Sequence, residues 1–326
     1  MSRCAPLVLA ALLLLMVCTL ALFAGSHWLS PHQLWLALTS SENPSADLRL
    51  LSTFRLPRVA AAVLIGALLS ISGCLLQGVT RNVLADPGLL GLHSGAHLAL
   101  VMLLLLASPV VAGNLRIPVA FAGAIVTVAL VFATSRQHGS TSRDILLIVG
   151  IAMGAALHAV GLLIAFSAPS EVLARAMVWT TGNLSGVGGR EVTLLFLTLA
   201  FVTPVALGIG KQMDLLALGD DCASSLGVSV TRVRLLAVTL GVLGASVCVA
   251  VGGAIASVGL IAPNLARRLV GPRSRPLLLL SVCCGATLVV LADTIGRTAF
   301  GMMELPAGIL VAAVGTPYFL CLLVFR

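Results

Sequence analysis

The chain is a succession of long apolar runs separated by short polar segments. The ten runs lie at about 5–24, 58–79, 92–112, 117–135, 145–167, 191–210, 233–253, 254–270, 276–296 and 306–325. A helix needs roughly 20 apolar residues to cross the hydrocarbon of a bilayer, whereas a membrane β-barrel shows short alternating segments. Glycine and serine are dense in the second and seventh runs, as close helix packing in lipid requires. The pattern predicts an all-α, polytopic membrane protein with about ten transmembrane helices in one domain, 1–326.

The composition excludes a water-soluble enzyme. Of the 326 residues, 59% are hydrophobic and 9% are charged, whereas about 25% are charged in soluble domains. The net charge of +8 does not indicate nucleic-acid binding, because the basic residues lie between the apolar runs, where membrane topology explains them. With a cytoplasmic amino terminus, alternation of the spans places 12 of the 19 basic residues inside. This agrees with the positive-inside rule, so we expect both termini in the cytoplasm and no nucleic-acid partner.

One outer connection is longer than a turn. We expect residues 168–190 to include a short helix over about 170–182. Ser170 is expected to be its N-cap and Glu171 to lie in its first turn, where a negative charge is favourable.

One inner connection, 211–232, is also long. It is expected to divide into two short helical pieces at Gly219, and the second piece opens with Asp220 and Asp221 at its positive end. It is the most polar amphipathic stretch on the inner side. It is therefore either a docking surface for a partner or a connector that lies on the lipid headgroups.

The residues that the spans lack argue against several classes of membrane protein. No Asp, Glu, Lys or Arg lies near the middle of a predicted span, whereas ion-driven carriers place such groups at mid-depth. A Gly-x-x-x-x-Gly-Lys-Ser/Thr phosphate loop is absent, since the only lysine, Lys211, precedes Gln212. His93 and His97 have a spacing that suits a metal, but no third ligand is nearby, so packing is the favoured interpretation. We expect no catalytic site, metal or cofactor in this chain.

Eight short motifs, read in order, carry a family resemblance. They are RLPR at 55–58, GCLLQG at 73–78, RNVLADPGLLG at 81–91, LLALG at 215–219, LGV at 226–228, VGLIAP at 258–263, LAD at 291–293 and ELPAG at 304–308. The ordered set resembles the FecCD-type permeases, the transmembrane subunits of type II binding-protein-dependent ABC importers for iron-siderophores, haem and cobalamin. The resemblance implies a second permease copy or close paralogue, two cytoplasmic ATPases that use ATP and Mg²⁺, a periplasmic binding protein, and a location in the bacterial inner membrane.

The resemblance also implies roles for arginines at the outer face. Arg55 and Arg58 match arginines that pair with acidic residues of the binding protein, and Arg297 matches a third. Because Arg55 and Arg58 lie on one helical turn, they can present a fork to carboxylates, which Arg suits better than Lys. The alternative is that they snorkel to the membrane interface at the start of a helix.

On the inner side, the resemblance implies that the segment at about 213–230 fits a groove on the ATPase. The residues concerned are Asp214, Leu215, Leu216, Gly219, Asp220, Leu226 and Gly227. The glycines would permit sharp turns and the leucines would be packing anchors. The loop before the fifth span resembles one that holds the cytoplasmic gate, which makes Thr141 and Ser142 gate candidates, with a simple helix cap as the alternative.

The cargo is not read directly from the residues. Residues 262–272 and 315–319 look most like siderophore permeases, whereas 28–31 and 140–143 look like the cobalamin member of the family. We therefore expect a ferric siderophore, with cobalamin or haem as alternatives, and selectivity mainly in the binding protein. An ion-coupled secondary carrier is the alternative from another functional class.

Overall fold

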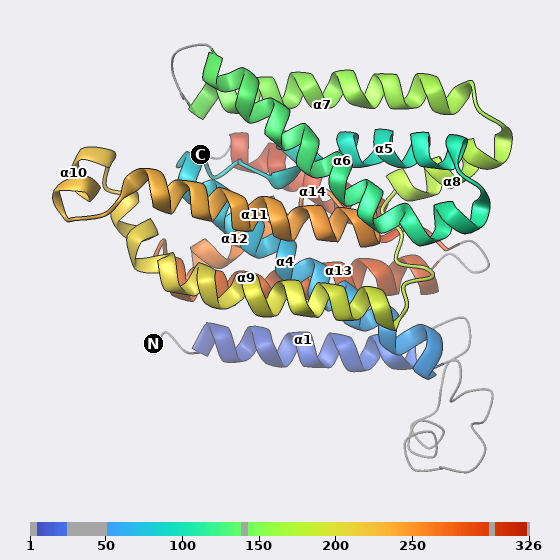
Figure 1. Cartoon of the computed structure of the whole chain (residues 1–326). Helices are drawn as coiled ribbons and strands as arrows, with labels where there is room; N and C mark the ends of the chain where they lie inside the picture. Colours follow the sequence, from blue (N-terminus) through green and yellow to red (C-terminus); the bar gives the residue numbers. More distant parts are fainter. Residues whose placement is uncertain (1–4, 25–50, 138–142, 300–303, 325–326) are drawn as a thin grey trace.

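The computed structural model describes residues 5–24, 51–137, 143–299 and 304–324, and every regular element in these ranges is a helix. The elements are α1 (Ala5–Phe23), η1 (Leu51–Arg55), α4 (Leu56–Thr80), η2 (Pro87–Leu90), α5 (Leu92–Leu106), α6 (Pro109–Gln137), α7 (Arg143–Phe166), α8 (Ser170–Thr180), α9 (Gly189–Leu216), α10 (Asp220–Ser225), α11 (Val230–Gly252), α12 (Val258–Val270), α13 (Ser274–Thr298) and α14 (Ala307–Val324). The long helices run lengthwise through one bundle, with α10 at one end and α8 at the other (Figure 1). The predicted all-α class is confirmed.

Each predicted span corresponds to a helix, but the helices of the runs at 92–112 and 254–270 are shorter than expected, and the first of these, α5, ends at Leu106. Seven of the described helices are long and apolar enough to cross a membrane, and α5 and α14 are shorter apolar helices. By contrast, α12 begins only at Val258 and has 13 residues, so at 1.5 Å per residue it covers about 20 Å of the roughly 30 Å of hydrocarbon. It does not begin earlier because Gly253 and Ser257 have φ angles of 73° and 68°, outside the right-handed helical region.

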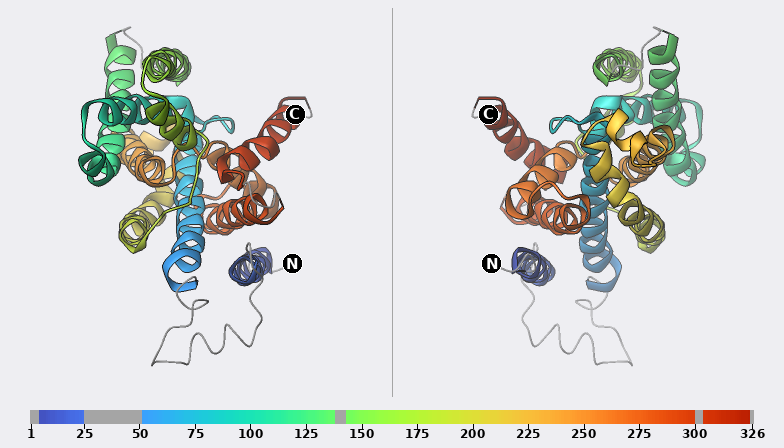
Figure 2. Two further views of the ribbon diagram at one scale, coloured as in Figure 1. Left: turned by 90° about the vertical axis from the view of Figure 1, so that its right-hand side faces the viewer. Right: turned by 90° about the vertical axis from the view of Figure 1, so that its left-hand side faces the viewer.

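The central helix of the bundle is α4. It packs against α9, α11, α12 and α13. Viewed along the bundle, α9 and α11 lie on one side of it and α12 and α13 on the other (Figure 2). Most of α4 is buried, whereas most of α1 is exposed, as expected of a helix that faces lipid. A residue at either end of α4 is therefore connected through packing to most of the bundle.

Small residues let α4 approach its neighbours closely. A Cβ on Gly66 would overlap the backbone of Gly285 in α13, and a Cβ on Gly73 would overlap the backbone of Gly259 in α12. In lipid, apolar contact between helices offers little gain over contact with acyl chains, so close backbone packing supplies much of the attraction. The glycine and serine density of the second run is explained by these crossings.

The outer connection contains the predicted short helix, with one correction. α8 covers Ser170–Thr180 and has Glu171 in its first turn, as expected. Its N-cap is Pro169, and Ser170 already belongs to the helix, so the prediction that Ser170 caps it is wrong. Because the backbone of Pro169 is extended, the helix begins directly after it, at Ser170, one residue earlier than predicted.

The inner connection also differs in part from the prediction. Its first piece is not a separate helix, because α9 continues without a break to Leu216. The second piece is α10, which begins at Asp220 directly after Gly219, as expected. The sequence between Lys211 and Leu216 contains no helix breaker, and Met213 and Leu216 extend the buried face of α9, so the helix runs past the apolar window.

Candidate functional site

A cluster of charges joins α4 to α13 at the end of the bundle that the sequence predicts to face outward. Arg58, in the first turn of α4, donates from Nε to both carboxylate oxygens of Asp293, at 2.9 and 3.1 Å, and from Nη1 to Glu304 at 2.8 Å. The side chains of Arg58 and Asp293 are 12% and 3% exposed, whereas that of Glu304 is 47% exposed. We call these three residues the outer ion cluster. The Glu304 carboxylate is the most exposed part of this cluster.

The other two predicted docking arginines hold the end of α1. Arg55 donates from Nη1 to the carbonyls of Leu22 and Phe23, at 3.0 and 3.3 Å, and Arg297 donates from Nη2 to the carbonyl of Ala21 at 2.7 Å. The last carbonyls of a helix lack intrahelical donors and attract cations. Both arginines are buried. Their role in docking stays a prediction, and it requires them to become accessible.

The opposite end of the bundle, predicted to face inward, carries a short exposed segment around α10, residues 218–227, which we call the α10 segment. Gly219 and Gly227 have φ angles of 122° and 81°, conformations that favour glycine. Next to them, the side chains of Leu218 and Leu226 are 65% and 58% exposed. Large apolar side chains exposed beside polar residues are typical of a protein interface.

Three of the predicted coupling residues are engaged within the chain instead. Asp214 accepts hydrogen bonds from the backbone N and the hydroxyl of Ser274, at 2.7 and 2.6 Å, and so holds the start of α13. Leu215 packs partly buried against the core, and Leu216 is 1% exposed. The role of Leu216 as an anchor for a partner stays a prediction, and it requires this side chain to become accessible. These residues lie in the last turn of α9. Leu218, which the sequence analysis did not select, lies beyond that helix and is exposed.

A second cluster of charges ties the α10 segment to two spans. One oxygen of Asp220, Oδ1, accepts from Arg81 at 2.6 Å and from Arg234 at 2.7 Å. Arg81 ends α4 in a left-handed conformation and also donates to the carbonyl of Leu216 at the end of α9. Arg234 lies near the start of α11. We call Arg81, Asp220 and Arg234 the inner ion cluster; the sequence analysis selected neither arginine.

A buried polar network joins α4, the connection that follows it, and α12. Gln77 donates to the carbonyls of Ala85 and Gly259, at 3.3 and 3.1 Å, and accepts from Arg267 at 2.9 Å. Arg267 also donates to Asn264 at 2.7 Å. Satisfied networks of this kind fix one arrangement of the elements that they join. Three of the motifs, at 73–78, 81–91 and 258–263, thus meet at one place.

The histidines of α5 lie in packed surroundings. The ring of His97 lies 5.6 Å from that of His158 and stacks on Trp179 at 6.3 Å, measured between ring centroids. His97 is buried. Across the part of the chain that the structure describes, no three His, Cys, Asp or Glu side chains gather as metal ligands. The contacts of His97 are those of a packed core residue.

The predicted gate residues, Thr141 and Ser142, lie outside the described residues. Their role therefore stays a prediction. The fifth span that follows them was expected from about residue 145, and the corresponding helix, α7, begins at Arg143.

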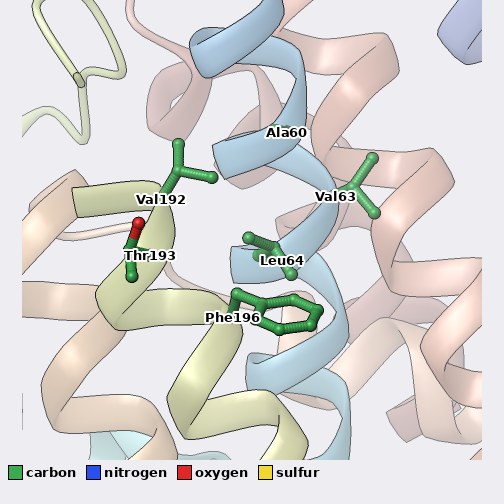
Figure 3. Close-up of a pocket in the computed structure, with 6 residues that line it drawn as sticks. All are labelled: Ala60, Val63, Leu64, Val192, Thr193 and Phe196. Atoms are coloured by element: carbon green, nitrogen blue, oxygen red, sulfur yellow. The ribbon is translucent and has the colours of Figure 1, made fainter. Parts of the chain in front are cut away.

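An apolar cavity of about 410 Å³ lies between α4 and α9 (Figure 3). It is lined by Ala60, Val63, Leu64, Val192, Thr193 and Phe196. The hydroxyl of Thr193 donates to the carbonyl of Gly189 at 2.9 Å, so it is already satisfied. With no charged residue in its lining, this surface suits an acyl chain better than a polar cargo.

Comparison with known proteins gives consistent matches over almost the whole chain. A model of the FecCD transport family matches residues 12–325. The Fe(3+)-citrate import system permease protein YfmE of Bacillus subtilis is 36% identical, with 98% of this chain and 95% of the relative covered. The vitamin B12 import system permease protein BtuC of Vibrio cholerae is 39% identical, with 96% and 91% covered. A solved structure described as an inward-facing conformation of a metal-chelate type ABC transporter has a TM-score of 0.84 at 28% identity and covers 98% of both chains.

Proposed function

From the premise that the chain belongs to the FecCD transport family, we propose that it moves a ferric siderophore across the bacterial inner membrane. It is a permease subunit of an ABC importer with the type II fold. Two permeases, this chain with a second copy or a close paralogue, enclose the pathway. Two cytoplasmic ABC ATPases bind ATP and Mg²⁺ and supply the energy. A periplasmic binding protein delivers the cargo, and both termini of this chain lie in the cytoplasm.

The exposed leucines of the α10 segment are the observation that carries the proposal. The segment lies at the end of the bundle where α1 begins (Figure 1), and the distribution of basic residues supports a cytoplasmic location for that end. Apolar surface in water is unfavourable, and a groove on a partner would cover it. We therefore assign Leu218 and Leu226 to contact with the ATPase.

The outer ion cluster supports a docking surface for the binding protein. Arg58 points Nε at the buried Asp293 and Nη1 at the exposed Glu304. Because a guanidinium has five donors in a planar fork, it can keep one carboxylate while it exchanges another. We propose that an acidic residue of the binding protein takes the place of Glu304 on Arg58, while Asp293 holds the side chain in position.

We propose a ferric siderophore as the cargo, in preference to cobalamin, because two stretches of the sequence look most like siderophore permeases. These stretches are 262–272 and 315–319. Overall identity does not separate the two cargoes, since it is 36% to the Fe(3+)-citrate permease and 39% to the vitamin B12 permease. The cargo of the cognate binding protein is therefore the decisive measurement.

Reconstitution tests the function directly. The permease is purified with the ATPase and the binding protein of its neighbouring reading frames, and uptake of a radiolabelled ferric siderophore into proteoliposomes is measured. We expect uptake to require ATP and the binding protein, and to continue in the presence of an uncoupler. Collapse of uptake by the uncoupler with ATP maintained would instead identify an ion-coupled carrier. ATP-driven uptake of cobalamin but not of the siderophore would overturn the cargo assignment alone.

A further inference from the structure

Resting on the proposed function, we infer that Asp220 is a positioning residue that transmits movement of the α10 segment to α4 and α11, with Arg81 and Arg234 as its partners. Its carboxylate would not contact the ATPase. Instead it would hold the segment that does so against the ends of two membrane spans.

The geometry of the inner ion cluster supports this role. A single oxygen, Oδ1 of Asp220, accepts from both Arg81 and Arg234, at 2.6 and 2.7 Å. Arg81 is the residue that ends α4, the central helix, and Arg234 lies in the second turn of α11. A displacement of Asp220 therefore acts on both spans at once.

Because α10 is short, the Arg81–Asp220 ion pair is an important part of its attachment to the bundle. The helix has six residues, and it packs against α9 and α11. Its buried anchor is the small side chain of Ala223. Among the described contacts, the Arg81–Asp220 ion pair is what ties α10 to α4.

The partial exposure of the cluster indicates a role in coupling between the subunits and only a small role in stability. All three side chains are between a quarter and a half exposed. Exposed ion pairs of this kind contribute little to the free energy of unfolding. The consequence of removing the pair should therefore appear in coupling between the subunits, with the fold retained.

The neighbouring Asp221 offers a matched control. It is an exposed acidic residue in the same short helix, so Asp221→Asn makes the same charge change one position away. The proposed test compares Asp220→Asn, Asp221→Asn and Asp220→Glu in the complete importer in proteoliposomes. Basal ATP hydrolysis and siderophore uptake are both measured, and the readout is uptake per ATP hydrolysed.

We expect Asp220→Asn to lower uptake per ATP hydrolysed by about threefold, the equilibrium factor of an exposed ion pair. Asp221→Asn should leave uptake per ATP hydrolysed unchanged, whatever its effect on ATPase binding, and Asp220→Glu should restore most of the coupling. Unchanged uptake per ATP hydrolysed in Asp220→Asn would overturn the inference. An equal loss in Asp221→Asn would also overturn it, because that result indicates a direct charge contact with the ATPase.

A measurement on the permease alone separates this inference from the proposed function. Amide hydrogen exchange of residues 218–227 in lipid nanodiscs needs neither ATPase nor cargo. Asp220→Asn should raise exchange there relative to Asp221→Asn, and unchanged exchange would overturn the inference. If the wild-type complex shows no ATP-driven uptake while exchange responds as expected, the proposed function fails and the structural tie remains.

Discussion

Arg58 in α4 and Asp293 in α13 form an ion pair at 2.9 Å although 235 residues separate them in the chain. The pair joins the start of α4 to the last turns of α13, and the glycines of these helices, Gly66 and Gly285, allow close backbone contact deeper in the bundle. Asp293 is almost fully buried, so its negative charge depends on the arginine for compensation. The pair therefore has a structural role in addition to any role in docking.

The first prediction concerns the stability of this pair. Asp293→Ala should lower the free energy of unfolding by about 3–5 kcal/mol, because it leaves the mostly buried Arg58 without its main partner. Glu304→Ala removes the exposed partner of the same arginine and should cost about 1 kcal/mol or less. Thermal unfolding in detergent micelles checks the difference. Equal losses in the two variants would show that burial does not distinguish the two carboxylates.

The second prediction concerns docking of the binding protein. Glu304→Gln frees one side of the Arg58 fork, so the affinity for the binding protein should rise about threefold, the factor expected of an exposed ion pair. Biolayer interferometry on the importer in nanodiscs measures it. Glu171→Gln is a suitable control, because it removes an exposed charge from α8 on the same outer side. An affinity that is unchanged or weaker in Glu304→Gln would contradict the exchange of carboxylates.

A third prediction addresses the paired reversal of Arg55 and Arg58 to Glu. We expect it to abolish productive docking and uptake while assembly with the ATPase persists. Because Arg58 compensates the charge of the buried Asp293 and Arg55 holds the end of α1, the double variant should in addition unfold at a lower temperature. Uptake at the wild-type level would refute the docking assignment of both arginines.

A fourth prediction tests the crossing of α4 and α12. Gly73→Ala places a methyl group on the backbone of Gly259 and should destabilise the protein by roughly 1–3 kcal/mol, as overpacking does. Gly208→Ala adds the same methyl group to α9 in open space, where it should be neutral or stabilise by up to about 1 kcal/mol. Thermal unfolding separates them, and two neutral variants would argue against this crossing.

The fifth prediction concerns the turn after α10. Gly227→Leu should uncouple ATP hydrolysis from uptake, because a φ of 81° costs an L-residue about 1–2 kcal/mol and the loop would shift. Gly271→Leu carries the same strain at a φ of 82°, at the end of α12. Uptake per ATP should fall only in Gly227→Leu. Equal losses in both variants would point to a general effect of strain, and normal coupling in Gly227→Leu would refute the docking assignment of the α10 segment.

The sequence predicted the helices well because a chain in hydrocarbon has few options. Every backbone polar group must be satisfied within the segment, so a long apolar run becomes a helix whatever its neighbours are. In the polar connection, a different signal located the start of α10, namely Gly219 followed by the two acidic residues Asp220 and Asp221. It overestimated the run at 254–270, because hydropathy does not register the positive φ of Ser257.

The candidate sites were only partly predictable. Arg58 and Asp220 were selected as candidate site residues, and Arg81 and Asp293 lie within motifs, but nothing in the sequence indicated which of these residues would pair with one another or with Arg234. Likewise, the motif around Leu215 and Leu216 gave no indication of which leucines would be exposed.

By itself, therefore, the sequence determined the helical membrane class, the order of the spans and the family. Only the tertiary structure decided that Asp293 belongs to Arg58, that one oxygen of Asp220 serves two arginines, and that Leu218 rather than Leu216 is exposed. The physical reason is that helix formation is satisfied by hydrogen bonds within one segment. Side-chain pairing depends instead on which faces of distant helices meet, and that is set by close backbone contacts such as Gly73 with Gly259.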